Sequence, residues 1–247
     1  MNKNILIISH ERSGTHFLLN SIAFNFPELI DSNKQIDAPW QTRDLAEFEQ
    51  FFLNNNQKEA RQIFKSHHQI DFYKGFIGDL VKKYHVFYIY RDGRDVLTSC
   101  FHYFNKCPDS FPHTKSIGEL MWGNPSEHAF DNAYSWEPQK TMVDRWVYHV
   151  HGWASIQPAI RDRIHFIKYE DLLNRWESAI TLISKILMPN NPPWSIPVNL
   201  RRPTLKDFGV SNRKGIVGDW KEHFTTSDRV YFKMKAKEIM NVLGYEI

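Results

Sequence analysis

Short runs of cationic and hydroxyl side chains offer the clearest chemistry in this sequence, and the first occupies residues 9–16 (SHERSGTH). Within it, Ser13 and Thr15 supply hydroxyl donors, Arg12 supplies a permanent charge, and Gly14 lets a ligand approach the backbone closely. The run precedes a segment with helical character, and a helix start presents unpaired N–H groups that favour an anion. The run is therefore either an anion-binding loop or a helix capped by Ser13 beside a surface arginine.

A lysine and a histidine stand two residues apart in the second run, at Lys65 and His67. Side chains two positions apart in a strand point to the same face, so both would face the anion while His68 points away. Neutral imidazole accepts a proton near neutral pH, and a lysine stabilises developing negative charge. The pair is consistent with acid–base catalysis, or with a solvated strand end that has no catalytic role.

Two further runs carry cations. Arg91 directly follows an apolar segment, and Ser99 lies two helical turns later. Near the C-terminus, Arg213, Lys214 and Gly215 combine two cations with an accessible backbone N–H, which is the chemistry of a phosphate site. The alternatives are a local salt-bridge cluster around Arg91 and a basic surface turn at 213–215.

A nucleotide kinase or ATPase would need the pattern G-x-x-x-x-G-K-[ST] in the first run. Aligned on Gly14, the sequence has Ser9 in place of the first glycine, Thr15 in place of lysine and His16 in place of the hydroxyl that binds Mg²⁺. A zinc pattern H-E-x-x-H beginning at His10 would need a second histidine where Gly14 stands. The loop therefore favours an anion that requires neither the P-loop lysine nor Mg²⁺.

The elements that position these runs are predicted from apolar periodicity. Strand-like and helix-like segments alternate, which indicates an α/β fold with a central parallel sheet flanked by helices. In such a sheet, ligands bind at the carboxyl ends of the strands, where the first three runs lie. The expected strands are 4–9, 62–65, 85–90 and 164–169, and the expected helices are 14–26, 76–84, 92–104, 141–160, 170–188 and 225–243.

Between these elements lie two irregular stretches. Residues 105–140 lack clear periodicity and are interpreted as a lid or acceptor-binding loop, and 189–203 form a Pro-rich connection. Aromatic residues are dense over 101–153 and belong either to an apolar pocket or to the core. We expect a single domain spanning 1–247.

Composition narrows the class of protein. Of 247 residues, 42% are hydrophobic and 24% charged, which excludes a disordered chain, a collagen-like chain and a coiled coil. A net charge of +3 is too small to indicate nucleic-acid binding. Two cysteines make no disulfide framework, and no apolar stretch approaches the roughly 20 residues of a spanning helix. We expect a cytoplasmic protein that binds neither nucleic acid nor membrane.

Taken together, the runs resemble the sulfotransferase family that uses 3′-phosphoadenosine 5′-phosphosulfate (PAPS), chiefly its cytosolic branch. Segments 12–17 (RSGTHF), 65–67 (KSH), 91–99, 169–171 (YED) and 213–220 (RKGIVGDW) are similar to family motifs and occur in the family's order. The last is the most specific. The resemblance implies a fold similar to that of P-loop NTPases and an enzyme that transfers a sulfuryl group from PAPS to a hydroxyl or amine of a small molecule, without a metal.

The resemblance also implies roles for individual residues. His67 would be the general base, Arg12 would stabilise the leaving phosphate and the transferring group, and Lys65 would assist, with Ser99 beside them. Phe17 and Tyr169 would contact the adenine. The residues implied to hold the donor are Arg12, Ser13, Gly14, Thr15, His16, Phe17, Arg91, Ser99, Tyr169, Arg213, Lys214 and Gly215.

The sequence departs from the family pattern at several positions. Arg12 and Phe17 stand where the cytosolic branch usually has lysine and tryptophan. The run 221–225 begins like the family's dimer motif, but Thr226 and Val230 break it, so the oligomeric state is left open. The remaining alternatives are a nucleotide-dependent phosphotransferase and a non-catalytic nucleotide-binding protein of the same fold.

Overall fold

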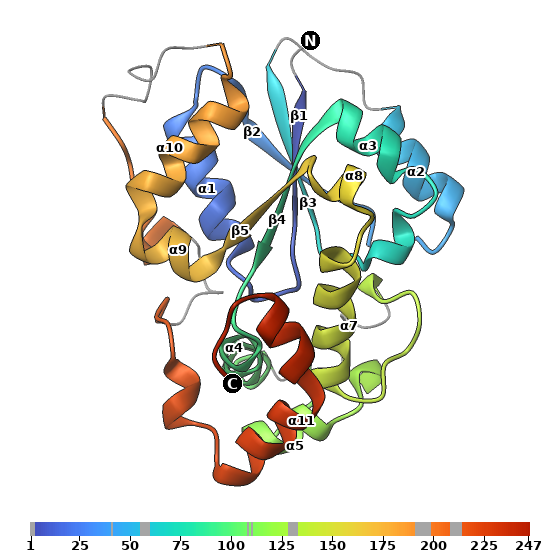
Figure 1. Cartoon of the computed structure of the whole chain (residues 1–247), viewed down its shortest axis with the longest axis vertical. Helices are drawn as coiled ribbons and strands as arrows, with labels where there is room; N and C mark the ends of the chain where they lie inside the picture. The colour runs from blue at the N-terminus through green and yellow to red at the C-terminus, as the bar shows by residue number, and fades with distance from the viewer. Residues whose placement is uncertain are drawn as a thin grey trace.

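A parallel β-sheet forms the centre of the protein in a computed structural model, which describes residues 3–40, 42–54, 60–107, 109, 111–127, 133–190, 199–207 and 214–247 (Figure 1). The strand order is β2-β3-β1-β4-β5, and every neighbouring pair is parallel. The strands are β1 (Asn4–Ile8), β2 (Ile30–Asp37), β3 (Arg61–Ser66), β4 (Tyr84–Tyr90) and β5 (Ile164–Lys168). The predicted α/β class and parallel sheet are confirmed.

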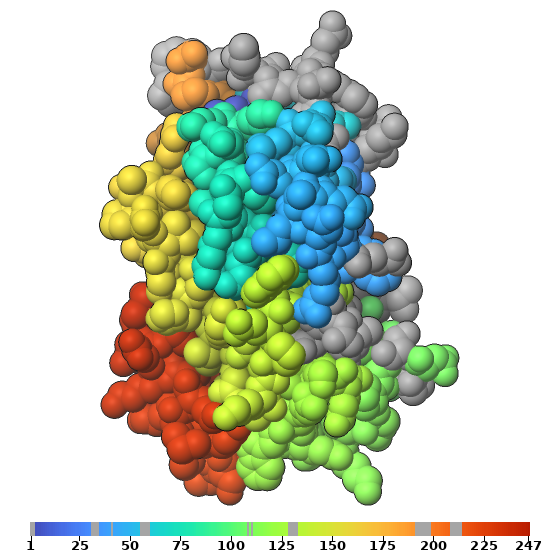
Figure 2. Space-filling model, turned by 90° about the vertical axis from the view of Figure 1, so that its right-hand side faces the viewer, coloured from blue at the N-terminus to red at the C-terminus, as the bar shows by residue number. Residues whose placement is uncertain are grey.

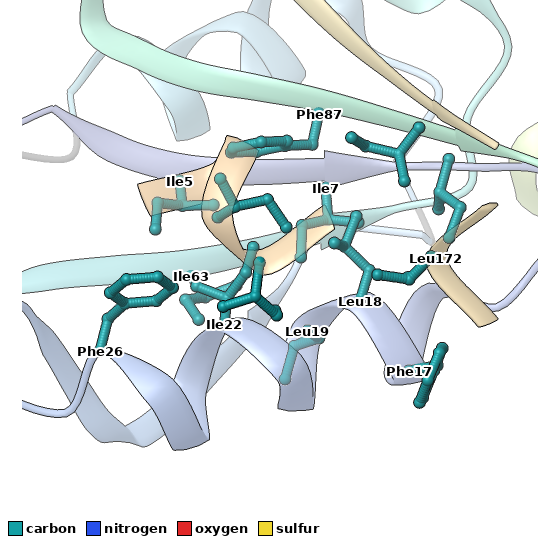
Figure 3. Packing of buried hydrophobic residues seen from close by; sticks show 14 of the residues in the cluster. Ile5, Ile7, Phe17, Leu18, Leu19, Ile22, Phe26, Ile63, Phe87 and Leu172 are labelled. Atoms are coloured by element: carbon teal, nitrogen blue, oxygen red, sulfur yellow. The ribbon is translucent and has the colours of Figure 1, made fainter. Parts of the chain in front are cut away.

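Helices cover both faces of the sheet because the inner strands are apolar on both sides. In β1, Ile5 and Ile7 point to one face while Leu6 and Ile8 point to the other, and all four are fully buried. The first face is covered by α1 (Thr15–Asn25), α9 (Tyr169–Asn174) and α10 (Trp176–Leu187), as Figure 3 shows for the packing of α1 on the sheet. The second face is covered by α2 (Leu45–Leu53), α3 (Ile77–Lys83) and α8 (Pro158–Arg161).

A third layer lies beyond the carboxyl ends of the strands. It comprises α4 (Gly93–Phe104), α5 (Ile117–Trp122), α7 (Met142–Ala154), α11 (Thr226–Val242) and the short 3-10 helix η4 (Asp219–Glu222). These elements enclose their own core around Trp146, and a Cβ on Gly93 would lie 2.8 Å from that indole ring. Figure 2 shows the C-terminal segment beside α7, with which α11 packs. This layer places the C-terminal part of the chain beside the carboxyl ends of the strands.

The edge strand β2 and the helix α2 were not predicted. The edge strand β2 has the polar sequence IDSNKQID and pairs on one side only, with β3, so it lacks the apolar run that marks the inner strands. Helix α2 is short, and its N-terminus is capped by Asp44, whose carboxylate accepts from the N–H groups of Ala46 and Glu47. Further 3-10 turns are η1 (Ile70–Phe72), η2 (Pro125–Glu127) and residues 205–207.

Two long helices predicted from periodicity are wrong as single elements. The expected helix 141–160 ends at Ala154, and Pro158 starts the separate helix α8, because proline lacks an N–H group and suits the first turn of a helix. The expected helix 170–188 is divided at Arg175, whose backbone lies at φ −126° and ψ 44°, outside the helical region.

The stretch 105–140 is more ordered than expected. It contains α5 and η2, and Phe111, Leu120 and Met121 are buried in the third layer; residues 108, 110 and 128–132 lie outside the described part. The aromatic residues of 101–153 were interpreted as core or as pocket lining, and the structure contains both. Trp146 and Trp153 are core residues, whereas Tyr103 and Tyr134 line a cavity. Among the described helices, none combines the length and apolar content needed to cross a membrane.

Candidate active site

A cavity of about 450 Å³ opens at the carboxyl ends of β1, β3, β4 and β5. It collects nearly all of the residues that the sequence singled out, from segments far apart in the chain. Those in its wall are Arg12, Gly14, Thr15, His16, Phe17, Lys65, His67, Arg91, Ser99, Tyr169, Lys214 and Gly215. Arg213 lies outside the described residues, and Ser13 is buried in the loop behind the wall.

The loop between β1 and α1 takes its shape from two residues in left-handed backbone conformations, Arg12 at φ 64° and Gly14 at φ 97°. Gly14 lies against the ring of Tyr169, and an added Cβ would be 2.4 Å from its Cδ2 atom. Helix α1 begins at the next residue, Thr15. Its first N–H groups have no partners within the helix and lie at this end of the loop, in the cavity wall. Ser13 Oγ is buried and has no hydrogen-bond partner among the described residues.

Arg12 connects this loop to α4. Its Nε donates to Ser99 Oγ over 3.1 Å, and its guanidinium lies 4.5 Å from the centre of the Tyr103 ring. Desolvation by burial lowers the pKa of Arg12, although arginine stays protonated at working pH. Ser99 is therefore bonded directly to Arg12, and Arg91 and Ser99 both line the cavity.

Arg91 joins three segments at the end of β4. Its Nη2 donates to the carbonyl of Ile216 over 2.9 Å, its Nη1 lies 3.4 Å from the carbonyl of Arg12, and its guanidinium stacks 4.5 Å from the centre of the Tyr169 ring. Its Nε is buried without a hydrogen-bond partner among the described residues. The side chain thus holds the walls of the cavity together and retains a donor.

His67 and Lys65 face the cavity from the end of β3, as their spacing predicted. His67 Nδ1 lies 2.9 Å from the carbonyl oxygen of Ser9, which can only accept a hydrogen bond, so Nδ1 carries the ring proton. In the neutral ring, Nε2 therefore holds the lone pair. Lys65 Nζ forms an ion pair with Asp37 Oδ1 at 3.0 Å. His68 points away, bonded to Ser66 Oγ and packed against Phe48.

The late segment reaches the cavity through Lys214 and Gly215. Gly215 has φ 62°, a conformation that favours glycine, and Lys214 Nζ lies 3.2 Å from Asp219 Oδ1. Asp95 on α4 holds this segment in place, because its carboxylate accepts from the N–H groups of Gly218 at 2.7 Å and Trp220 at 3.1 Å.

Sequence reasoning missed a buried ion pair that reaches the cavity wall through Glu11. Glu11 accepts from both terminal nitrogens of Arg145, at 2.9 and 2.7 Å, and Arg145 also lies 2.8 Å from His10 Nε2. Burial disfavours the charged carboxylate, but Arg145 outweighs that effect and holds the pKa of Glu11 well below its usual range. Burial lowers the pKa of His10 to about 4, so this imidazole is neutral near pH 7.

The same polar network extends to His67. His149 Nδ1 lies 3.0 Å from the Tyr88 hydroxyl, and its Nε2 lies 3.1 Å from the carbonyl oxygen of His67. His149 lies in α7, within the range 141–160 that was predicted to be helical. The sequence held no signal for its contact with the backbone of His67, since that contact joins α7 to β3.

The segment 202–205 forms a further part of the wall that the sequence did not predict. Arg202 donates to the carbonyl of Leu173 over 2.7 Å and lies near the ring of Phe17. Thr204 and Leu205 line the cavity beside it. The Pro-rich character of 189–203 predicted a connection between elements. It did not predict that the end of this connection lies in the cavity wall, which only the fold shows.

Replacing Gly14 with alanine is expected to lower the free energy of unfolding by more than about 1 kcal/mol, because an L side chain is strained at positive φ and the new Cβ would overlap Tyr169. Gly78 in α3 is the matched control: its Cβ would meet nothing within 4 Å, so Gly78→Ala should be neutral or stabilising by up to about 1 kcal/mol. Urea unfolding measures both. An equal change in the free energy of unfolding in the two variants would contradict the close approach of Tyr169 to Gly14.

The family model described as "Sulfotransferase domain" matches residues 2–188 of this chain. Sulfotransferase 2A1 of Macaca fascicularis is 24% identical over 274 residues, an alignment that covers 100% of this chain and 87% of the relative. The amine sulfotransferase of Oryctolagus cuniculus is 22% identical over 262 residues, covering 96% and 80% respectively.

Solved structures are similar over nearly the whole chain. Mouse sulfotransferase SULT7A1 complexed with PAP has a TM-score of 0.64 and 21% identity, covering 97% of this chain and 85% of that one. Retinol dehydratase in a complex with retinol and PAP has a TM-score of 0.62 and 15% identity, covering 100% and 83%. At these identities the structures support the fold, and the matched family model covers well over half of the sequence. The chain belongs to the sulfotransferase family.

Proposed function

We propose that this protein transfers a sulfuryl group from PAPS to a hydroxyl or amine of a small molecule, with His67 as general base. The observation that carries the proposal is the tautomer of His67: Nδ1 donates to Ser9, which leaves the Nε2 lone pair available in a cavity lined by Arg12 and Arg91. A base and two fixed cations around one cavity suit the transfer of an anionic group.

The donor site fits a nucleotide with two phosphate groups. Ser13 Oγ and Arg91 Nε are buried donors without partners among the described residues. They lie in segments 12–17 and 91–99, which we assign to the 5′-phosphosulfate and the 3′-phosphate of the donor. Phe17 and Tyr169, whose rings lie 6.3 Å apart edge to face, supply an aromatic wall for the adenine. The similar structures solved with PAP support this assignment. PAP is 3′,5′-adenosine bisphosphate, the nucleotide that remains when PAPS loses its sulfuryl group.

Transfer would proceed in line. The acceptor oxygen or nitrogen forms a bond to sulfur, the bond between sulfur and the phosphate oxygen breaks, and the acceptor proton passes to His67 Nε2. Arg12 stabilises the leaving phosphate by charge and hydrogen bonding alone, since arginine does not give up a proton. A sulfuryl group carries less negative charge than a phosphoryl group, so side-chain cations and N–H donors suffice for stabilisation.

The acceptor side of the cavity is aromatic. Tyr134 lies edge to face with His67 at 5.4 Å between ring centres, and Tyr103 lies beneath Arg12. Tyr134 belongs to the stretch 105–140, which supports a role for that stretch in acceptor binding, and Tyr103 belongs to the end of α4. We therefore propose a small acceptor with an apolar body; the neighbouring structures solved with retinol and with androsterone support such a ligand.

Calorimetry and a transfer assay test the proposal. We expect 3′,5′-adenosine bisphosphate to bind more tightly than ATP with Mg²⁺, and radiolabelled PAPS to label at least one member of a panel of phenols, alcohols and amines. Tighter binding of ATP with Mg²⁺ would favour a phosphotransferase. Tight bisphosphate binding with no transfer to any acceptor class would favour a non-catalytic nucleotide-binding protein.

The acid limb of the pH profile of kcat/KM should have its midpoint below pH 6.5. Desolvation by burial lowers the pKa of His67 below its ordinary 6.5; the nearby Glu11 carboxylate opposes this shift and Lys65 adds to it. A base acts in its unprotonated form, so a lowered pKa keeps it active to lower pH. Initial rates at subsaturating acceptor between pH 4.5 and 8 measure the limb, and a midpoint above 6.5 would contradict the assignment.

A further inference from the structure

A second cluster of chemically active side chains lies outside the cavity wall. His102 belongs to the last turn of α4, Asp219 opens η4, and His223 directly follows η4. One ligand atom from each of these residues lies within 4.8 Å of the other two. None of the three is among the described residues that line the 450 Å³ cavity.

The spacing is close to that of a metal site. His223 Nε2 lies 3.3 Å from Asp219 Oδ2, and the rings of His102 and His223 meet nearly edge to face, with centres 4.9 Å apart. With zinc–nitrogen and zinc–oxygen bonds of about 2.1 Å, two ligand atoms on a tetrahedral Zn²⁺ lie about 3.4 Å apart. The His223–Asp219 pair already has that separation, and all three ligand atoms lie within 4.8 Å of one another.

The local charge also favours a cation. Asp219 is buried, and a buried carboxylate is stabilised by positive partners. Asp219 Oδ1 lies 3.2 Å from Lys214 Nζ, and Asp219 Oδ2 lies 3.3 Å from His223 Nε2. His102 lies at the C-terminal end of α4, where the helix dipole is negative.

We propose that His102, Asp219 and His223 bind Zn²⁺, with solvent completing the coordination shell. Two imidazoles and a carboxylate are a ligand set that zinc accepts. The ion fastens the end of α4 to η4. Since α4 carries Ser99 and the segment before η4 carries Lys214 and Gly215, the ion braces two walls of the cavity from outside.

The test uses the whole chain, stripped of metal with a chelator and dialysed, with ZnCl2 as the titrant in calorimetry. We expect one tight equivalent, and a melting temperature that rises by several degrees at saturating zinc because the ion binds only the folded state. His102→Gln and His223→Gln should each weaken binding at least tenfold. His151→Gln, at an exposed histidine on α7, is the matched control and should bind as the parent does.

X-ray absorption of the zinc-loaded parent keeps the test independent of the variants' folding. Scattering from two imidazoles is expected, and a shell of oxygen atoms alone would overturn the proposal. So would parent-like affinity in both glutamine variants, an equal loss in His151→Gln, or no binding by the parent. These measurements need neither donor nor acceptor, so their outcome is separate from that of the proposed sulfuryl transfer.

Discussion

Replacing His67 with alanine is expected to lower turnover by roughly 10²- to 10⁴-fold and to leave the affinity for 3′,5′-adenosine bisphosphate nearly unchanged. The large effect follows from the position of Nε2, which is unprotonated in the neutral ring because Nδ1 donates to the carbonyl of Ser9. The cations Arg12 and Arg91 remain in the variant, so donor binding should persist.

The adjacent histidine is the matched control for this experiment. His68 belongs to the same short run but is fully buried on the other side, bonded to Ser66, so His68→Gln should retain near-parent turnover per folded molecule. Single-turnover transfer from labelled PAPS separates the chemical step from binding, and calorimetry reports the nucleotide affinity. Near-parent turnover in His67→Ala would remove His67 from its role as base, and a large loss of nucleotide affinity would assign it to binding instead.

The convergence of Arg12, His67 and Arg91 could be predicted from the sequence for a simple geometric reason. Each residue follows one of the predicted strands that form the inner part of the sheet, and all carboxyl ends of a parallel sheet meet at one edge. Because the strands were predicted to be parallel, the sequence alone predicted that these side chains lie close together. Arg213 belongs to the same prediction and stays a prediction, as it lies outside the described residues.

The features that could not be predicted depend on contacts between residues far apart in the sequence, or on segments whose hydrophobic pattern is weak. Strand β2 is an edge strand of mainly polar residues, so its periodicity does not distinguish it from a loop. The turn that divides 170–188 at Arg175 has no proline or glycine to mark it. The pairing of Glu11 with Arg145 joins the first loop to α7, and neither residue carries a local signal of its partner.

Replacing Arg145 with methionine is expected to lower the free energy of unfolding at pH 7 by about 3–5 kcal/mol, the range found when a buried ion pair loses one partner. Glu11 and Arg145 are both nearly inaccessible to solvent, and the carboxylate takes two hydrogen bonds from the guanidinium. Without Arg145, Glu11 remains buried as an uncompensated charge or must take up a proton. Arg163→Met, at an exposed arginine, should change stability by less than about 0.5 kcal/mol.

A second variant and a change of pH show whether the uncompensated charge causes the loss. The double variant Glu11→Met with Arg145→Met removes both charges and should recover much of the stability, because replacing a buried pair by apolar side chains is often neutral. Arg145 holds the pKa of Glu11 below its usual 4.5, so the pair stabilises the parent fully above pH 4.5 and progressively less below it. The stability gap between parent and Arg145→Met should therefore narrow on acidification. Urea unfolding between pH 3.5 and 7 measures the gap, and a double variant no more stable than Arg145→Met would show that packing, rather than charge, is the function of this arginine.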